Sequence, residues 1–220
     1  MSGIQLMFLG QAQQGNIATS TFINTYAIGS AISTYNFTTA TIPAGLVAIT
    51  ISSEDPSNTA ISSVTIGGVS ATRAAEFSQN FNGGTVGAIW YAVIGSSTTS
   101  VSVSFVVAQL RCGIGVYTIE NYLSATPVYT NAVGGTSITT SITTPSISSG
   151  SSIIAVRTTG DLYAHTWSGV TENYDNRIAG GLTGQTGASL DTSTTQTHTI
   201  QSTVLSAPAQ GTTMAVAVWS

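Results

Sequence analysis

Short runs of apolar residues, separated by glycine, proline and small polar residues, recur along most of this 220-residue chain. The run at 101–105 (VSVSF) alternates strictly, so its apolar residues share one face of a β-strand. The run at 46–51 (LVAITI) is almost continuously apolar, which is typical of a strand at the centre of a sandwich. No window keeps a helical period over three turns. The pattern therefore predicts an all-β protein with little helix.

Residues 61–122 contain the densest series of predicted strands. Two short runs, at 64–66 and 69–71, are separated by Gly67 and Gly68. Glycine adopts the positive φ of a two-residue hairpin without steric cost, so this pair predicts a tight β-hairpin. Further strands are expected at 87–94, 101–105 and 112–119. We interpret the series as an antiparallel meander that must be covered by a second layer.

The same reading predicts strands on either side of this series. The expected strands are 35–42, 46–51, 137–142, 152–156, 180–190, 197–205 and 213–219. The segment 167–175 is expected to be rich in turns. We detect no linker and no internal sequence repeat.

The first 34 residues differ from the remainder, and we predict two parts: residues 1–34 as an N-terminal arm or edge strand, and residues 35–220 as one antiparallel, jelly-roll-like β-sandwich. The short strand 4–9 has apolar residues on both faces, which favours addition to another sheet. An ordinary strand of the chain's own sheet is an equally open interpretation. The side chains expected to bind a partner through the arm are Ile4, Leu6, Phe8, Phe22 and Tyr26.

Charge is scarce, because only 5% of residues are charged and lysine is absent. Four arginines and a net charge of −4 cannot neutralise a row of phosphates, so nucleic-acid binding is not expected. No apolar run is long enough to span a membrane, and the N-terminus lacks a basic signal region. We expect a mature cytoplasmic product whose hydroxyl-rich surface favours lasting assembly. A secreted Ser/Thr-rich β domain is the alternative that this composition also fits.

Catalytic chemistry has few candidate residues. The two imidazoles are His165 and His198, and Asp161 lies four residues before the first. No nucleophile-elbow motif surrounds a serine, so we predict that the protein is not an enzyme and binds no cofactor. The single cysteine, Cys112, excludes an internal disulfide and is expected to be a small buried apolar side chain.

Binding residues are equally few. Oxygen ligands at 172–176 leave calcium open, but their spacing is not that of an EF-hand, and no metal site is predicted. Trp90 is expected in the core, whereas Tyr163, Trp167 and Tyr174 are candidates for a contact surface, such as a glycan-stacking platform.

Ion pairs are predicted for two of the arginines. We expect Arg111 and Arg157, which border predicted strands, each to pair with a carboxylate such as Glu120 or Asp161.

Five segments, taken in order, resemble a β-sandwich domain found in virion proteins of tailed bacteriophages. They are 64–72 (VTIGGVSAT), 89–93 (IWYAV), 111–117 (RCGIGVY), 167–175 (WSGVTENYD) and 214–219 (MAVAVW). The resemblance covers roughly residues 35–220 and leaves the N-terminal arm outside.

The resemblance implies a structural virion component, either a capsid decoration (cement) protein or part of a tail or fibre. As a decoration protein it would bind the major capsid protein and copies of itself, as a dimer or trimer on the capsid surface. A tail or fibre module that binds a host-surface glycan or receptor is the alternative. The resemblance implies no catalytic residues.

Overall fold

The computed structural model describes residues 17–54, 60–79, 84–161, 164–179, 181–206 and 211–220. This part of the chain contains no helix, hence none that is long and apolar enough to cross a membrane. Its strands are β1 (Thr19–Ile28), β2 (Ile32–Ile42), β3 (Gly45–Glu54), β4 (Ile61–Ile66), β5 (Val69–Ser70), β6 (Thr72–Gln79), β7 (Thr85–Ile94), β8 (Thr98–Gln109), β9 (Arg111–Glu120), β10 (Tyr129–Gly135), β11 (Thr139–Thr143), β12 (Ser152–Thr159), β13 (His165–Ser168), β14 (Thr171–Arg177), β15 (Gly184–Asp191), β16 (Thr199–Val204) and β17 (Thr212–Trp219). The predicted all-β class is confirmed.

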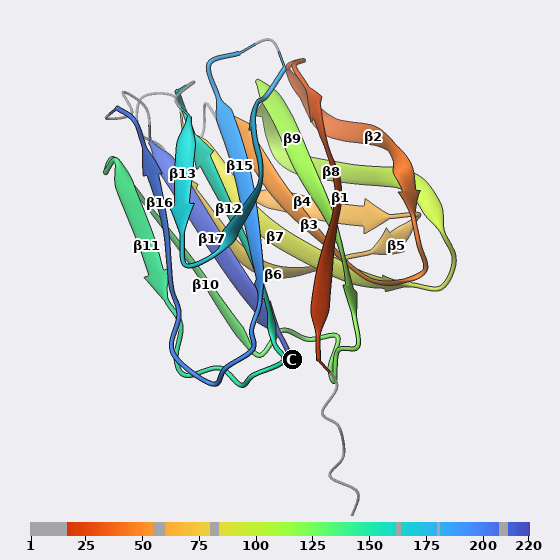
Figure 1. Cartoon of the computed structure of the whole chain (residues 1–220). Coiled ribbons are helices and arrows are strands. Elements are labelled where there is room, and N and C mark those ends of the chain that lie inside the picture. The colour runs from red at the N-terminus through yellow and green to blue at the C-terminus, as the bar shows by residue number, and fades with distance from the viewer. Residues whose placement is uncertain (1–16, 55–59, 80–83, 162–163, 180, 207–210) are drawn as a thin grey trace, which may run out of the picture.

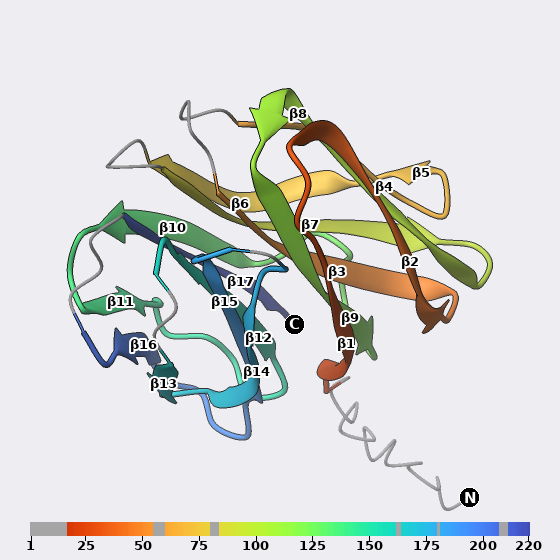
Figure 2. The same cartoon turned by 90° about the horizontal axis from the view of Figure 1, so that it is seen from above.

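The strands form four antiparallel sheets that stack as layers (Figures 1 and 2). We call β2-β8-β4-β5 the first outer sheet and β1-β9-β3-β7-β6 the first inner sheet. Likewise, β10-β17-β12-β15-β14 is the second inner sheet, and β11-β16-β13 is the second outer sheet. The two inner sheets face each other, so the predicted sandwich is confirmed but has four layers.

Three hydrophobic cores fill the spaces between the four layers. Alternation along β3 sends Val47 and Ile49 toward the first outer sheet, and Leu46 and Ala48 toward the second inner sheet. A third cluster, which includes Ile153, lies between the second inner and second outer sheets. Strands β3 and β12 are therefore covered on both faces, which explains their nearly continuous apolar sequences.

The strand topology occurs twice along the chain. In each half, the chain passes repeatedly between two facing sheets, which is a jelly-roll-like arrangement; the exceptions are the neighbours β4 and β5, β6 and β7, and β14 and β15, which share a sheet. The second half repeats the first when β10, β11, β12, β13, β14, β15, β16 and β17 replace β1, β2, β3, β4, β6, β7, β8 and β9. Only β5 has no counterpart. The chain thus consists of two jelly rolls, and the duplication is visible in the topology although we detected no sequence repeat.

The two jelly rolls pack through their inner sheets in a symmetric order. Strand β1 faces β14, β9 faces β15, β3 faces β12, β7 faces β17, and β6 faces β10. When every strand is replaced by its counterpart in the other half, the pair β1–β14 becomes β10–β6, and the pair β9–β15 becomes β17–β7. The central pair, β3–β12, becomes itself. This is the order that a two-fold axis parallel to the strands would produce.

Glycines allow the inner sheets to approach closely. A Cβ on Gly115 would lie 2.5 Å from Thr50 Oγ1 and 2.7 Å from the Tyr174 ring, and a Cβ on Gly187 would lie 2.3 Å from the same ring. Tyr174 occupies the space that these glycines leave, and its hydroxyl lies 2.8 Å from Thr50 Oγ1. The ring of Phe22 stacks on Tyr174 at 5.4 Å. These contacts join residues that are far apart in the sequence into one interface.

The interface changes from apolar to polar toward one end of the stack. Along β3, the side chains that face the second jelly roll change from Leu46 to Ser52 and then to Glu54. Glu54 Oε2 lies 2.8 Å from Arg111 Nε and accepts a 2.6 Å hydrogen bond from Thr183 Oγ1. Strands β1, β3, β8, β12 and β14 finish at this end (Figure 1).

Two local predictions need correction. Residues 61–122 do not form a meander, because β7 lies in the first inner sheet whereas β8 pairs with β2 and β4 in the first outer sheet. The segment 167–175 is not a turn-rich loop but contributes to β13 and β14. In contrast, the hairpin at Gly67 and Gly68 is confirmed, with φ of 58° and 80°.

The N-terminal part contributes a strand to the chain's own fold. Residues 19–28 form β1, the edge strand of the first inner sheet, and pair with β9. The boundary that we expected between residues 34 and 35 falls inside β2. Ile4, Leu6 and Phe8 lie outside the described residues.

Candidate functional site

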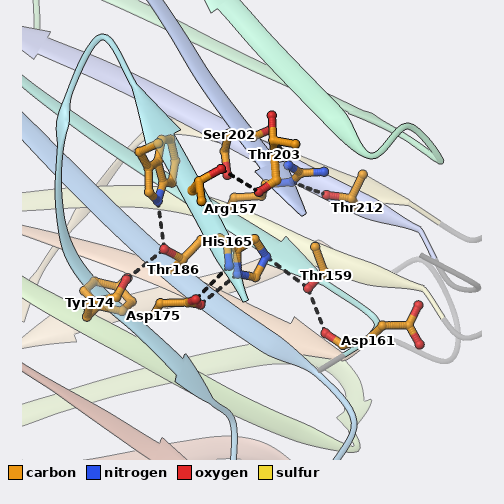
Figure 3. Close-up of polar contacts among 12 residues, drawn as sticks. Arg157, Thr159, Asp161, His165, Tyr174, Asp175, Thr186, Ser202, Thr203 and Thr212 are labelled. Atoms are coloured by element: carbon orange, nitrogen blue, oxygen red, sulfur yellow. Dashed lines mark hydrogen bonds and ion pairs between the residues drawn. The ribbon is translucent and has the colours of Figure 1, made fainter. Parts of the chain in front are cut away.

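The best-defined polar cluster lies inside the second jelly roll and is organised around His165 (Figure 3). His165 begins β13 in the outer sheet, and its Nδ1 lies 2.7 Å from Oδ1 of Asp175 on β14 of the inner sheet. The other carboxylate oxygen accepts a 2.7 Å hydrogen bond from the His165 backbone N–H. On the opposite side of the ring, Nε2 lies 3.2 Å from Oγ1 of Thr159, the last residue of β12. The cluster therefore ties the two sheets together.

The hydrogen bonds around His165 engage both nitrogens of its ring. Nδ1 contacts the Asp175 carboxylate, and Nε2 contacts Thr159 Oγ1. Thr159 Oγ1 also donates to the carbonyl oxygen of Asp161 at 2.9 Å. The ring is therefore fixed on both sides by polar groups of its own chain.

Asp175, His165 and Thr159 follow the order carboxylate, imidazole, hydroxyl, which is also the order of a nucleophilic triad. Such a triad can act only if a substrate reaches the hydroxyl. Thr159 is completely buried, and His165 is nearly so. A substrate cannot approach Thr159 Oγ1, whose hydrogen is already bound to a backbone carbonyl. The geometry therefore supports a bridge between β12, β13 and β14 rather than nucleophilic attack.

Arg157 is the second unusual group of this region, because it is a fully buried arginine inside a core. Its Nε donates to Thr212 Oγ1 at 2.8 Å, and its terminal nitrogens donate to the carbonyls of Ser137, Ile138 and Ser202. Burial lowers the pKa of the Arg157 guanidinium to about 10, which leaves it charged at neutral pH. Five donors and a planar shape allow arginine to bind several carbonyls at once. The predicted pairing with a carboxylate is replaced by a cage of neutral oxygens.

The aromatic candidates for a contact surface are used inside the molecule where the structure describes them. Tyr174 is 7% exposed and lies between the inner sheets. Trp167 is half-buried against the third core, and its indole N–H donates to Thr186 Oγ1 at 2.8 Å. Thr186 in turn donates to the Tyr174 carbonyl. Tyr163 lies outside the described residues.

The two described arm residues also have partners in their own chain. Phe22 packs on Tyr117 at 5.3 Å and on Tyr174. The Tyr26 hydroxyl accepts a 2.5 Å hydrogen bond from the backbone N–H of Ala40 on the edge strand β2. Both side chains therefore hold sheets of this chain together.

The acidic residues after Trp167 lie on β14. Burial raises the pKa of Glu172, and the nearby Asp175 carboxylate adds to the effect. Asp175 itself is engaged by His165. Within the described ranges, no three His, Cys, Asp or Glu side chains gather in a way that would hold a metal ion.

The two side chains that contact the His165 ring, Asp175 and Thr159, were not predicted as its partners from the sequence. Asp175 is ten positions from His165, and a register shift in β14 between Glu172 and Tyr174 helps to set the position of its side chain. Asp161, which lies four residues before His165, contributes its backbone carbonyl to Thr159. The sequence did contain a signal for this strand, because side chains alternate between two faces along residues 172–176. We interpreted the segment as a turn.

Comparison with known proteins gives no family. No protein-family model matches the chain, and no curated protein matches it. Among the solved structures, a candidate secreted protein from Eubacterium rectale is similar at 9% identity, over 96% of this chain and 75% of that chain, with a TM-score of 0.18. A likeness at this TM-score carries no argument about fold or function.

Proposed function

We propose that this protein is a structural virion component of a tailed bacteriophage that decorates the capsid surface and stabilises the head by binding across capsomers. Its partners are the major capsid protein and copies of itself, and it performs no catalysis. The resemblance of five ordered segments to phage virion domains is the starting point. The observation that carries the proposal is the continuous buried contact between two jelly rolls, because it makes one stiff block of the chain.

The distribution of charge supports an adhesive role. Arg111 is paired with Glu54, Arg73 lies 3.9 Å from Glu76, and Arg157 is buried in a cage of neutral oxygens. Three of the four arginines are therefore engaged within the chain. The remaining surface offers little electrostatic repulsion to a neighbouring subunit. Many identical copies, each with a modest contact, resist internal pressure together.

The polar cluster around His165 also favours a structural role. Its hydroxyl is inaccessible and its hydrogen-bonding groups are satisfied within the jelly roll. A glycan-binding fibre module is less well supported. Trp167 already donates its indole N–H to Thr186, and Tyr174 is buried.

The N-terminal segment provides the test. Residues 1–16 contain no charged side chain, and removing them leaves β1 complete. The deletion must not extend to Ser20, whose backbone N–H and hydroxyl both bind Asp191 Oδ1. We expect the 17–220 protein to fold normally but to fail to bind capsids that lack the native protein. Normal decoration by the truncated protein would exclude the arm as the attachment.

The position in the particle distinguishes the alternatives. Immunogold labelling over the head, with hundreds of copies per virion by quantitative mass spectrometry, is the expected result. About a dozen copies or fewer at a tail tip, together with loss of host adsorption in Trp167→Ala, would favour the fibre alternative instead.

A further inference from the structure

The two inner sheets meet through a row of small residues on one side and larger polar residues on the other. Neighbouring strands of each sheet contribute one residue each to this central row. The first inner sheet, through β9, β3 and β7, contributes Gly113, Ser52 and Gly87. The second inner sheet, through β17, β12 and β15, contributes Thr213, Thr158 and Gln185. Since β9, β3 and β7 are the counterparts of β17, β12 and β15, the two triplets occupy equivalent positions in the two halves.

The larger side chains of the central row lie on glycines of the opposite sheet. A Cβ on Gly113 would lie 2.2 Å from Gln185 Oε1, and a Cβ on Gly87 would lie 2.7 Å from Thr213 Oγ1. Both polar side chains are buried in a close-packed interface, so they have little free space into which they could move. The glycines of the first jelly roll therefore leave the space that side chains of the second jelly roll fill.

The relationship is reversed two residues further along β3, at the polar end of the interface. Here the first inner sheet carries the large residues, because Glu54 pairs with Arg111 on β9. The equivalent residues of the second jelly roll are Gly160 and Gly211, whose backbones are joined by a hydrogen bond of 3.1 Å. The Arg111 guanidinium covers Gly181 so closely that a Cβ there would overlap with it. At this end, side chains of the first jelly roll lie against glycines of the second.

We propose that the two inner faces accept each other and reject copies of themselves, so that each jelly roll pairs only with a jelly roll of the other kind. At equivalent positions the two halves differ in opposite directions: where one has a larger side chain, the other has a glycine or a serine. Differences of this kind decide which face fits which, because specificity depends on the penalty for the wrong partner as well as on the fit of the right one.

A pair of first jelly rolls from two copies would leave gaps and bring like charges together. In the same two-fold arrangement, β9 would face β7 of the other copy, so Gly113 would lie opposite Gly87 with no side chain between them. Unfilled space of this kind loses dispersion contacts. Near the axis, Glu54 would face its own equivalent in the other copy, and opposed like charges are unfavourable in an interface.

A pair of second jelly rolls would instead be overfilled. Gln185 would lie opposite Thr213 of the other copy, and Thr158 would lie opposite its own equivalent. The central row of the second inner sheet contains no glycine that could accommodate these side chains. Overpacking forces side chains out of their preferred rotamers and shifts the backbone. Only the mixed pair brings a larger side chain and a smaller residue together along the whole row.

This discrimination bears on how the chain folds when many copies are present. Two similar domains in one chain can pair wrongly between copies, which is a characteristic failure of such proteins. Residues 121–128 connect β9 to β10 and keep the two halves of one chain at a high effective concentration. The mismatch in self-pairs adds a second safeguard, which acts on the faces themselves. The proposal concerns folding and does not depend on a position in a virion.

A double-mutant cycle tests the match between one side chain and its glycine. Gly113→Ala is expected to lower the midpoint of urea unfolding, because the new Cβ would clash with the Gln185 amide. Gln185→Ala removes that amide, so the double variant is expected to unfold close to the midpoint of Gln185→Ala alone. The control pairs Gln185→Ala with Gly95→Ala, whose Cβ position has nothing within 4 Å, and its effects should add. A loss from Gly113→Ala that persists in full without the Gln185 amide would overturn the proposal.

Thiol trapping tests the rejection of self-pairs. Ser52 and Thr158 lie near the axis, so a cysteine at either position shows which faces have met. All variants carry Cys112→Ala, so that the introduced thiols are the only ones. The full-length variants are refolded from urea at high protein concentration under oxidising conditions. S52C/T158C is expected to form a disulfide within one chain, because the two native hydroxyls lie 2.7 Å apart. S52C alone and T158C alone are expected to keep free thiols.

Intact mass and non-reducing electrophoresis distinguish the outcomes, since a disulfide within one chain removes two hydrogens whereas a disulfide between chains doubles the mass. S52C/T158C also shows that the oxidant reaches this position. Covalent dimers of S52C alone or T158C alone, in a yield comparable to the internal disulfide of the double variant, would overturn the proposal.

Discussion

The hydroxyl of Thr158 on β12 forms a 2.7 Å hydrogen bond with the hydroxyl of Ser52 on β3, at equivalent positions of the two jelly rolls. Each residue lies on the central strand of its inner sheet, so the bond lies near the axis that relates the halves. It shows that the two jelly rolls are aligned in height as well as in orientation. Several consequences of this close contact can be measured.

Gly115, at the interface between the inner sheets, is expected to be important for stability. In Gly115→Ala, the new Cβ would lie 2.5 Å from Thr50 Oγ1 and would press on the buried Tyr174 ring. Overpacking of this kind costs about 1–3 kcal/mol. Urea unfolding should show the loss as a lower midpoint. Gly95→Ala is the control, because nothing lies within 4 Å of its Cβ position, and it should change stability little.

The 2.7 Å contact between His165 and Asp175 predicts a strong coupling energy. His165→Gln and Asp175→Asn should each lower the free energy of unfolding by about 1–3 kcal/mol, because each leaves a buried polar partner unsatisfied. The double variant should lose less than the sum of the two. A double-mutant cycle by urea unfolding measures the difference. Purely additive losses would show that the ring and the carboxylate do not act on each other.

Replacement of the buried Arg157 is expected to lower the free energy of unfolding more than replacement of an exposed arginine. Arg157→Met removes the donors for the Ile138 and Ser202 carbonyls inside a core, so we expect a loss of at least about 3 kcal/mol. Arg177→Met is the matched control, because Arg177 is exposed, and surface changes of this kind stay within about 0.5 kcal/mol. Equal stability of the two variants in thermal and urea unfolding would contradict the role of Arg157.

Alkaline pH should destabilise the fold. Burial raises the pKa of Tyr35 to about 12 and raises those of Tyr117 and Tyr174, while these groups ionise near pH 10 in the unfolded chain. Above about pH 10 the unfolded state therefore binds fewer protons than the folded state, and stability falls as pH rises. Burial also raises the pKa of the Cys112 thiol, which acts in the same direction. Arg157 acts in the opposite direction, because burial lowers its pKa, but it is one group against these four.

Urea unfolding at a series of alkaline pH values, with tyrosinate absorbance followed in parallel, measures this dependence. The free energy of unfolding should be nearly constant below about pH 8, should begin to fall as Cys112 ionises in the unfolded chain, and should fall more steeply above about pH 10. Tyr35→Phe removes one of the three tyrosines, so its curve should fall less steeply. A stability that rises through this range would mean that Arg157 outweighs the tyrosines.

Local structure was largely predictable from the sequence, whereas the assignment of strands to sheets was not. Alternation at 101–105 and the continuous apolar run at 46–51 correctly indicated strands, and Gly67 and Gly68 indicated the hairpin. The same alternation occurs in every sheet of a four-layer stack. It cannot tell that β7 and β8 lie in different sheets, which is why the expected meander was wrong.

The duplication was hidden because equivalent positions hold chemically different residues. Ile51 precedes Ser52 in the first core, whereas Arg157 precedes Thr158 in the second. One position is apolar and the other carries a buried guanidinium. The bond between His165 and Asp175 was hidden for a related reason, since it depends on how β13 and β14 from two different sheets come together. Neither relationship can be read from spacing along the chain.

Joining two jelly rolls in a single polypeptide has a consequence for how the molecule can vary. In a pair of identical subunits, any substitution appears twice, on both sides of the axis. Here a change in one half leaves its counterpart untouched, so one flank can acquire a new specificity while the other keeps the old one. The ratio of the halves stays fixed at every concentration, because neither can dissociate from the other.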